Sequence, residues 1–454
     1  MITGSAFAGK RYCVLGLARS GMAVVESLLA SGAAVTAWDR QEEPRARIAD
    51  RVEIGDPMAI DLSPFDAIVV SPGVPLNTHP IAERARAAGV PVIGDIELFA
   101  LARPDLPPHR VVGITGTNGK STTVALVAHL LKQAGVPALM GGNIGLPVLS
   151  REPLREGGVY VLELSSYQLD LTRSLACEAA ALTNVTPDHL DRYGGFEDYA
   201  FSKSRLFAMQ GSGQFAVFGC GDTMTRSIRD GAAARREAGR AICADPAAWA
   251  DRQAGWPALQ GPHNLENAAI AIALARELGL PDTQIKEGLA TFSGLPHRME
   301  RLCEVRGVQF VNDSKATNPA SSAPALAAFP PQGDGPRVHW IVGGLPKGED
   351  LGECAAELGN VAAAYTIGEA GPHFADLLDG TVPVERSEML CEAARRAAQA
   401  ARPGDVVLLS PACASFDQFR DYEARGDAFR AIVDALVTAP NEDPCCVESA
   451  GEVG

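Results

Sequence analysis

The residues best suited to chemistry lie in the run Gly-Ile-Thr-Gly-Thr-Asn-Gly-Lys-Ser-Thr, which spans 113–122. A β-branched stretch precedes this run and an apolar-periodic helix follows it, which is the layout of a loop that cradles a triphosphate. Lys120 can reach the terminal phosphates, and the Ser121 hydroxyl can bind Mg²⁺. Five residues, not the usual four, separate Gly113 from the Gly-Lys pair. A glycine-rich turn with no ligand therefore stays an alternative.

Lysine is scarce in this chain, so each lysine is informative. Lys and Arg together number 40, yet only seven are lysine. Lysine offers a compact, titratable amine that arginine cannot supply. Lys120, Lys315 and Lys347 lie in segments rich in Gly, Asn or Asp, and Lys203 follows a cluster of candidate metal ligands. These four lysines are the ones we expect to act in chemistry.

Two candidate metal ligands follow the phosphate loop. Glu163 ends an apolar strand run, where an acid can hold Mg²⁺ directly or through water. His189 lies between Asp188 and Asp191 and could also bind a metal. A solvated acid at a strand end and an exposed histidine in a turn are the alternatives for these two positions.

Other polar groups cluster after strands or on one helical face. Asn264 and Asn267 lie three residues apart, one helical turn, so two amides can face a nucleobase, although both could instead be helix caps. Asn143 lies on a glycine-rich loop that could also be a structural turn. The segment 312–318 packs six polar groups into seven positions, and two further turns, 343–348 and 410–419, follow strands and offer donors for a carboxylate.

The elements that must position these groups alternate apolar strand runs with helical patterns, which predicts α/β layers with mostly parallel sheets. The 454 residues suit several domains. The first has the strand, glycine turn, helix, strand and acid (Asp39) of a dinucleotide-type half. We place the domains at 1–107, 108–299 and 300–440, with an acidic tail at 441–454 that is predicted to be disordered.

Bulk properties narrow the class of protein. The net charge of −15 argues against a nucleic-acid or membrane-surface partner. No apolar run approaches the ~20 residues of a membrane span, and no signal peptide is visible at the N-terminus. The ten cysteines have scattered spacing, so we expect neither a zinc site nor a disulfide framework, and the chain is predicted to work in the cytoplasm.

Taken together, these motifs resemble those of the Mur ligases, the ATP-dependent amide-forming enzymes of peptidoglycan precursor synthesis. The resemblance covers roughly residues 10–437. It rests on the segments GITGTNGKST, NVTPDHLDRY, HNLENA, GLPHRME, NDSKATN and GG-x-x-KG, while GGNIGLP, VLELSSYQL and LLSPACASFDQF point to the D-glutamate-adding branch. The five-residue loop spacing is what this family uses.

The resemblance implies a three-domain α/β fold: a Rossmann-like domain for a UDP-sugar, a P-loop-type ATPase domain and a C-terminal Rossmann-like domain for the amino acid. It also implies that ATP phosphorylates the carboxylate of UDP-N-acetylmuramoyl-L-alanine, that the amine of D-glutamate attacks the acyl phosphate, and that two Mg²⁺ ions assist. Lys120, His189 and Lys203, which matches the lysine that is carbamylated in this family, would be catalytic.

The same resemblance assigns the remaining contacts residue by residue. Those to ATP would be Gly116, Thr117, Asn118, Gly119, Lys120, Ser121, Thr122, Asn264, Asn267, Arg298, Asp313 and Lys315. Those to Mg²⁺ would be Ser121, Glu163, His189 and Lys203. Those to the UDP-sugar would be Ser20, Asp39, Ser71, Gly73 and Asn143, and those to D-glutamate Thr317, Lys347, Ser415 and Tyr422, a tyrosine where we would expect phenylalanine.

Three other functions remain open from sequence. A sister Mur ligase or a folylpolyglutamate synthase would use a different amino acid, and the 410–419 segment argues against both. A nucleotide-dependent switch ATPase would not need the polar clusters of two further domains. A dehydrogenase would need the complete glycine fingerprint in the turn after the first strand, where Gly16 and Gly21 stand without the third glycine. We expect a monomer.

Overall fold

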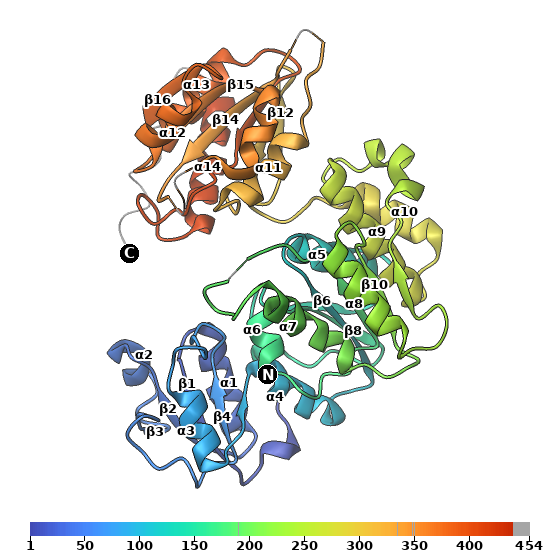
Figure 1. The fold of residues 1–454 in the computed structure, drawn as a ribbon, viewed down its shortest axis with the longest axis vertical. Coiled ribbons are helices and arrows are strands. Elements are labelled where there is room, and N and C mark those ends of the chain that lie inside the picture. Colours follow the sequence, from blue (N-terminus) through green and yellow to red (C-terminus); the bar gives the residue numbers. More distant parts are fainter. Residues whose placement is uncertain (189, 334, 347, 349, 439–454) are drawn as a thin grey trace. The chain divides into compact units, whose positions relative to one another are not determined.

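The computed structural model describes residues 1–438 except positions 189, 334, 347 and 349. The predictions for His189, Lys347 and the acidic tail therefore lie outside the described residues. The chain divides into two compact units, one of Met1–Ala248 with Glu266–Leu289 and one of Trp249–Leu265 with Ala290–Gly454. Three sheets organise these units (Figure 1).

The first sheet is parallel, in the order β3-β2-β1-β4-β5. Helix α1 covers one face through Val24 and Leu28, and α3 covers the other through Ile81 and Ala85. Because β1 lies between β2 and β4, the chain reverses its direction of winding there, and ligands bind at such a point. The elements are η1 (Ser5–Phe7), β1 (Arg11–Leu15), α1 (Arg19–Ala30), β2 (Ala34–Trp38), α2 (Glu42–Ala46), β3 (Glu53–Ile54), β4 (Ala67–Val70), α3 (Ile81–Ala88), β5 (Val92–Ile93), α4 (Asp95–Ala102) and η2 (Arg103–Asp105).

The second sheet is also parallel, in the order β11-β10-β9-β6-β8-β7. Its central strand β6 leads into the phosphate loop. The elements are β6 (His109–Thr115), α5 (Lys120–Gln133), β7 (Ala138–Gly142), η3 (Val148–Ser150), β8 (Gly158–Glu163), α6 (Ser166–Asp170), β9 (Ala179–Leu182), α7 (Phe196–Ala208), β10 (Phe215–Phe218), α8 (Thr223–Ala233), β11 (Ala241–Cys243), η4 (Ala247–Gly255), α9 (Pro262–Glu277) and α10 (Asp282–Thr291).

The third sheet has the order β12-β13-β17-β14-β15-β16 and is parallel except for β12, which pairs antiparallel with β13. One apolar cluster joins α11 and α12 to one face, and a second joins α13 and α14 to the other. The elements are β12 (Glu300–Val305), β13 (Val308–Asn312), α11 (Pro319–Ala327), β14 (Val338–Gly343), η5 (Gly352–Asn360), β15 (Val361–Ile367), α12 (Gly371–Leu378), β16 (Val384–Glu388), α13 (Leu390–Ala400), β17 (Val406–Leu409) and α14 (Tyr422–Thr438).

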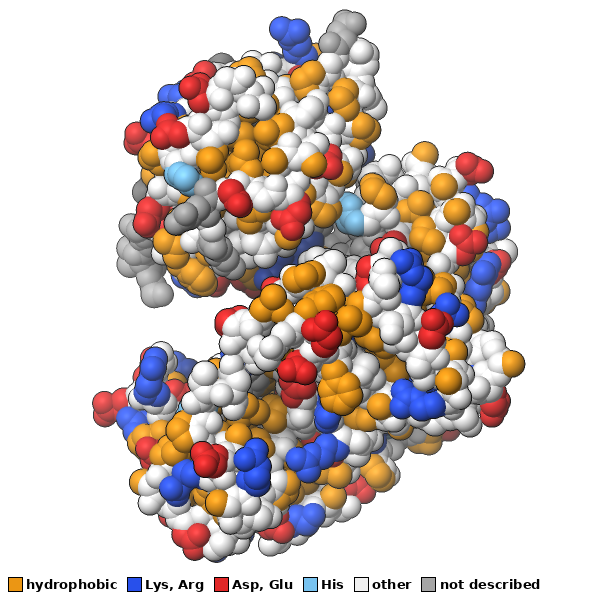
Figure 2. All heavy atoms as spheres, viewed as in Figure 1, with side chains coloured by type: hydrophobic (Ala, Val, Ile, Leu, Met, Phe, Trp, Pro, Cys, Tyr) orange, Lys and Arg blue, Asp and Glu red, His pale blue; other side chains and the backbone are white. Residues whose placement is uncertain are grey.

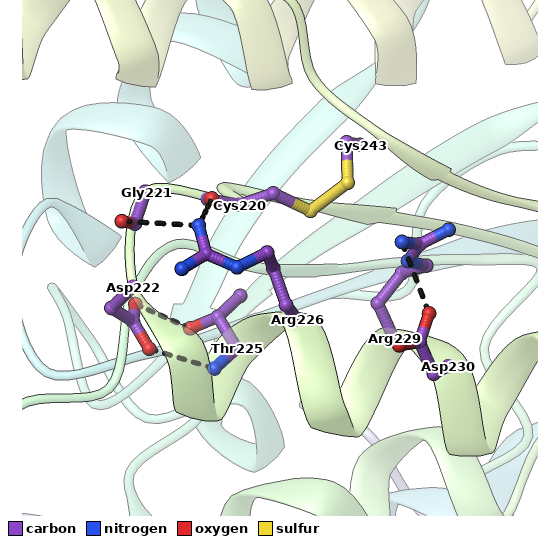
Figure 3. Close-up of a disulfide and its surroundings, with 8 residues drawn as sticks. All are labelled: Cys220, Gly221, Asp222, Thr225, Arg226, Arg229, Asp230 and Cys243. Carbon is purple, nitrogen blue, oxygen red and sulfur yellow. Dashed lines mark hydrogen bonds and ion pairs between the residues drawn. A yellow bond between two sulfur atoms is a disulfide. The ribbon is translucent and has the colours of Figure 1, made fainter.

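One sequence prediction is wrong: Cys220 and Cys243 form a disulfide, with Cα atoms 5.6 Å apart (Figure 3). The reason is structural, because β10 and β11 are neighbouring parallel strands in which Phe218 lies opposite Cys243. Cys220 comes two residues after Phe218, at the same end of the sheet. Strand β11 has only three residues, so no pattern along the chain indicates that the two cysteines lie side by side.

The surface and the helices add two observations. On the face drawn in Figure 2, acidic and basic side chains are interspersed and do not gather by sign. None of the helices in the described part of the chain is long and apolar enough to cross a membrane.

Candidate active site

The loop between β6 and α5 has the backbone that a phosphate cradle needs. Gly116 and Gly119 have φ angles of 148° and 81°, values that side-chain-bearing residues rarely adopt. A Cβ on Gly119 would lie 2.2 Å from Oδ1 of Asn267, and one on Gly116 would lie 1.8 Å from Oγ1 of Thr183. Both positions therefore require glycine.

Lys120 lies over this loop. Its Nζ donates hydrogen bonds to the carbonyl oxygens of Gly116, at 3.0 Å, and Thr117, at 2.7 Å. Asn184, just after β9, steadies the same loop by accepting from the backbone amides of Thr117 and Asn118. The Lys120 ammonium group is thus held at the N-terminus of α5. A triphosphate bound there would place its negative charge at the positive end of the helix dipole, which favours binding.

Glu163, at the end of β8, lies beside the phosphate loop. Ser121 Oγ donates to its Oε2 at 2.5 Å, and Asn143 Nδ2 donates to its Oε1 at 3.0 Å. Ser121 and Glu163 are each 3 % exposed, whereas Asn143 is exposed, so the structure brings a buried hydroxyl and carboxylate together beside an amide that solvent can reach.

This group fits a magnesium ion that ATP would bring. Mg²⁺ prefers oxygen ligands and is commonly held by one or two protein groups together with phosphate oxygens. No set of three or more His, Cys, Asp or Glu side chains gathers among the residues described. The protein would therefore supply the Ser121 hydroxyl and the Glu163 carboxylate, and the nucleotide would complete the site.

Lys203 lies deep in the same site. It is on α7, is 2 % exposed, and donates from Nζ to the carbonyl oxygen of Gly116 at 2.8 Å. Its Nζ also lies 4.3 Å from the centre of the Tyr199 ring, and the Tyr199 hydroxyl is 3.2 Å from Thr117 Oγ1. Burial, followed by the charge of Lys120, holds the pKa of Lys203 well below its usual value. A buried amine of this kind becomes neutral and nucleophilic easily.

Asn264 and Asn267 both lie on α9 and are each 4 % exposed. Asn267 Oδ1 accepts a hydrogen bond from Thr123 Oγ1 at 3.3 Å and packs against Gly119. Asn264 Nδ2 donates to the carbonyl oxygen of Gln260. These contacts place Asn267 against the phosphate loop, and the assignment of both amides to the nucleotide stays a prediction.

The predicted UDP-sugar residues of the first sheet gather at the carboxyl ends of β1, β2 and β4. Asp39 Oδ2 accepts from the Leu17 amide at 2.6 Å, and Ser71 Oγ donates to the Gly16 carbonyl at 2.8 Å. Ser20, Ser71 and the buried Asp95 lie around the same point at this edge. Gly73 follows in the same turn after β4. Asn143 instead follows β7 of the second sheet.

The predicted residues of the third sheet cluster around the turn after β13. Asp313 is 7 % exposed, and it accepts from Ser410 Oγ at 2.8 Å and from the Met299 amide at 3.1 Å. Burial raises the pKa of Asp313 to about 7. Lys315 Nζ lies 4.3 Å from the centre of the Tyr422 ring, so the structure brings these two predicted residues together. Ser415 is buried in the turn after β17.

Sequence reasoning missed Arg425, which holds two predicted loops together. Its side chain on α14 is 1 % exposed and donates to Ser314 and to the carbonyl oxygens of Cys413 and Ala414. Burial lowers its pKa to about 10. An arginine inside a charged, amphipathic helix looks like a surface residue in sequence, so the pattern held no signal for it.

The described geometry defines a nucleotide-dependent enzyme of three α/β sheets, and comparison with known proteins identifies its class. Residues 10–94 match the model of the Mur ligase MurD-like N-terminal domain, 114–245 the Mur ligase middle domain, and 297–413 the Mur ligase glutamate ligase domain. The chain belongs to the Mur ligase family and is an enzyme of the ligase class.

Particular relatives cover the whole chain. A UDP-N-acetylmuramoylalanine–D-glutamate ligase of Novosphingobium aromaticivorans is 65 % identical over 98 % of this chain and 99 % of its own length. The protein of the same name from Sphingopyxis alaskensis is 61 % identical over 96 % of this chain and 100 % of its own length. Among solved structures, a UDP-N-acetylmuramate–alanine ligase from Thermotoga maritima has a TM-score of 0.56 at 17 % identity, covering 95 % of this chain and 99 % of its own. This last likeness concerns the fold alone.

Proposed function

We propose that this chain joins D-glutamate to UDP-N-acetylmuramoyl-L-alanine at the expense of ATP, in the cytoplasmic synthesis of peptidoglycan precursors. The observation that carries the proposal is the continuous 65 % identity to a ligase of that name across a chain whose phosphate loop, Lys120 and Glu163 are built for a magnesium triphosphate. We also propose that it acts as a monomer, with domains at 1–107, 108–299 and 300–440.

The first step activates a poor electrophile. One oxygen of the substrate carboxylate attacks the γ-phosphorus of ATP, the bond from that phosphorus to the bridging oxygen breaks, and an acyl phosphate and ADP form. Lys120 and the loop amides stabilise the charge that develops on the phosphoryl oxygens. Ser121 and Glu163 would hold magnesium, which would supply further charge neutralisation when bound.

The second step forms the amide. The amine of D-glutamate attacks the acyl carbon, a tetrahedral intermediate loses inorganic phosphate, and the amine gives up a proton. Thr317, Lys347, Ser415 and Tyr422 would hold D-glutamate, while Ser20, Asp39, Ser71, Gly73 and Asn143 would hold the UDP-sugar.

Lys203 has a further proposed role. The ammonium group first loses a proton, the neutral amine attacks CO₂, and the adduct loses a second proton to give a carbamate. The cation thereby becomes an anion, which would help to hold a second magnesium ion together with His189. The short distance from Lys203 Nζ to the phosphate loop and its lowered pKa support this role.

The nucleotide itself would be held from several elements. Gly116, Thr117, Asn118, Gly119 and Thr122 would bind its phosphates alongside Lys120 and Ser121. Asn264 and Asn267 would face the base, and Arg298, Asp313 and Lys315 would complete the site.

The experiment that tests the chemistry follows an oxygen label. UDP-N-acetylmuramoyl-L-alanine carrying ¹⁸O in its carboxylate is incubated with ATP and D-glutamate, and the phosphate released is analysed by mass. One labelled oxygen in phosphate, together with a UDP-sugar product that gains one glutamate, supports the proposal. Unlabelled phosphate would exclude the acyl phosphate, and a product without glutamate would exclude the ligase specificity.

A further inference from the structure

Arg298 lies between two residues held in a strained backbone conformation. His297 and Met299 have φ angles of 61° and 46°, in the left-handed region that residues other than glycine enter at a cost of order 1–3 kcal/mol each. This segment follows α10 and leads into β12. Such strain persists only where the surroundings over-determine it, so the contacts of these residues show what holds Arg298 in place.

Asn312, the last residue of β13, makes the contacts that hold the strained segment. Its side chain is fully buried, and its Nδ2 lies 3.1 Å from His297 Nδ1, 3.2 Å from Glu300 Oε2 and 3.0 Å from the carbonyl oxygen of Gly426. Its Oδ1 accepts from the Ser314 amide at 3.2 Å. One amide group thus ties the segment before β12 to the turn after β13 and to α14.

Helix α14 closes the other side of His297. A Cβ on Gly426 would lie 2.1 Å from His297 Nδ1, so the ring fills the space that glycine leaves. Arg430, one turn further on, donates to both oxygens of Glu300 at 2.7 and 2.9 Å. Glu300 Oε2 in turn accepts from the His297 amide at 2.9 Å. The histidine is therefore fixed through both its ring and its backbone.

The strained segment is hydrogen-bonded to the turn that carries the predicted nucleotide contacts. The His297 carbonyl accepts from the Lys315 amide at 3.0 Å, and the Met299 amide donates to Asp313 Oδ1 at 3.1 Å. Arg298 lies between these two bonds. Its backbone is therefore fixed on both sides to the turn that carries Asp313 and Lys315.

We infer that Asn312 is a positioning residue for the nucleotide. It holds His297 and the 313–315 turn, and it thereby fixes the point of the backbone from which the Arg298 side chain extends. This inference rests on the proposed function, because it takes Arg298 as a nucleotide contact. Asn312 itself is fully buried, so it acts through its neighbours and need not touch ATP.

A double-mutant cycle tests the inference. The Asn312→Ala, Arg298→Ala and combined variants of the full chain are compared by KM for ATP, KM for D-glutamate and the thermal shift produced by Mg·ADP. We expect Asn312→Ala to raise KM for ATP about tenfold in the native background and less than about twofold in the Arg298→Ala background, since coupled residues are not additive. Asn360→Ala is the matched control, because its amide donates to Leu326 and Glu357 within the same sheet domain, and it should leave KM for ATP unchanged.

The outcomes separate the two claims. If Arg298→Ala leaves KM for ATP unchanged, the proposed role of Arg298 is wrong. If Arg298→Ala raises it but the effect of Asn312→Ala is the same in both backgrounds, Asn312 acts on the fold alone and the inference is wrong.

A second pair of variants tests the same idea by steric means. Gly426→Ala should push the His297 ring aside and raise KM for ATP. His297→Gly removes the ring that Asn312 contacts, so it should also raise KM for ATP. Unchanged KM for ATP in both variants would contradict the inference.

Discussion

Replacing Asp313 by Asn should stabilise the third-sheet domain while lowering ligase activity. Asp313 is buried and accepts hydrogen bonds from Ser410 and the Met299 amide, and burial raises its pKa to about 7 from an ordinary value of 3.8. The folded state therefore disfavours the charged form. Asparagine keeps the shape and can keep both hydrogen bonds, because the Ser410 hydroxyl can turn to donate to Ser322 Oγ, 3.0 Å away.

The magnitude follows from proton linkage. Between pH 3.8 and about 7 the folded protein binds the Asp313 proton and the unfolded chain does not, so stability falls as pH rises through this window and levels off above it. At about 1.4 kcal/mol per pH unit, the whole window is worth about 4 kcal/mol. The stability of the Asn variant minus that of the native protein should grow by about 2 kcal/mol between about pH 5 and pH 7, then by less than about 0.5 kcal/mol up to pH 8.5.

The assay must report on this domain alone. Hydrogen exchange of the slowest amides of β14, Val338–Gly343 at the centre of the third sheet, gives its opening free energy at each pH. Taking the difference between variant and native protein cancels the other titrating groups. A difference that stays flat from pH 5 to pH 7 would show that Asp313 is already ionised in the folded protein and would refute the reasoning.

Three further predictions concern the first unit. Gly119→Ala should raise KM for ATP by about tenfold or more, because its Cβ would meet Asn267 Oδ1 at 2.2 Å and its φ is 81°; steady-state kinetics and a retained circular dichroism spectrum check this, and an unchanged KM would contradict it. Lys203→Arg keeps the charge but cannot form a carbamate, so kcat should fall about a hundredfold or more. Bicarbonate should no longer stimulate the variant, and equal stimulation of the variant and the native protein would argue against the carbamate. The bond from Cys220 to Cys243 spans 23 positions, so reduction should destabilise the native protein by about 3 kcal/mol in urea unfolding and leave the double Ser variant unaffected; equal curves with and without reductant would argue against the bond.

The sequence predicted most of the second sheet because local pattern and chemistry agree there. The run from Val111 to Thr122 combines a buried strand, a glycine loop and an amphipathic helix, and each of these is a local property. Glu163 can be predicted in the same way, because it ends a continuous apolar strand. These residues lie at carboxyl ends of neighbouring parallel strands, which explains why they meet.

Other features depend on contacts far apart in the sequence. Strands β3 and β5 have two residues each, and β11 has three, too few to show a period. Arg425 and Asn312 owe their importance to partners more than about a hundred positions away, such as Ser314 and Gly426. Single-sequence patterns report the neighbours along the chain, so the burial and partners of such residues become visible only in the fold.

The measurement that tests the central claim most directly is phosphate release from ATP with UDP-N-acetylmuramoyl-L-alanine and, in turn, D-glutamate, L-glutamate, L-alanine or meso-diaminopimelate. We predict release that requires both the UDP-sugar and D-glutamate. Release with another amino acid would contradict the proposed specificity while leaving the ligase. Release that needs neither the UDP-sugar nor an amino acid would contradict the proposed reaction and favour a switch ATPase.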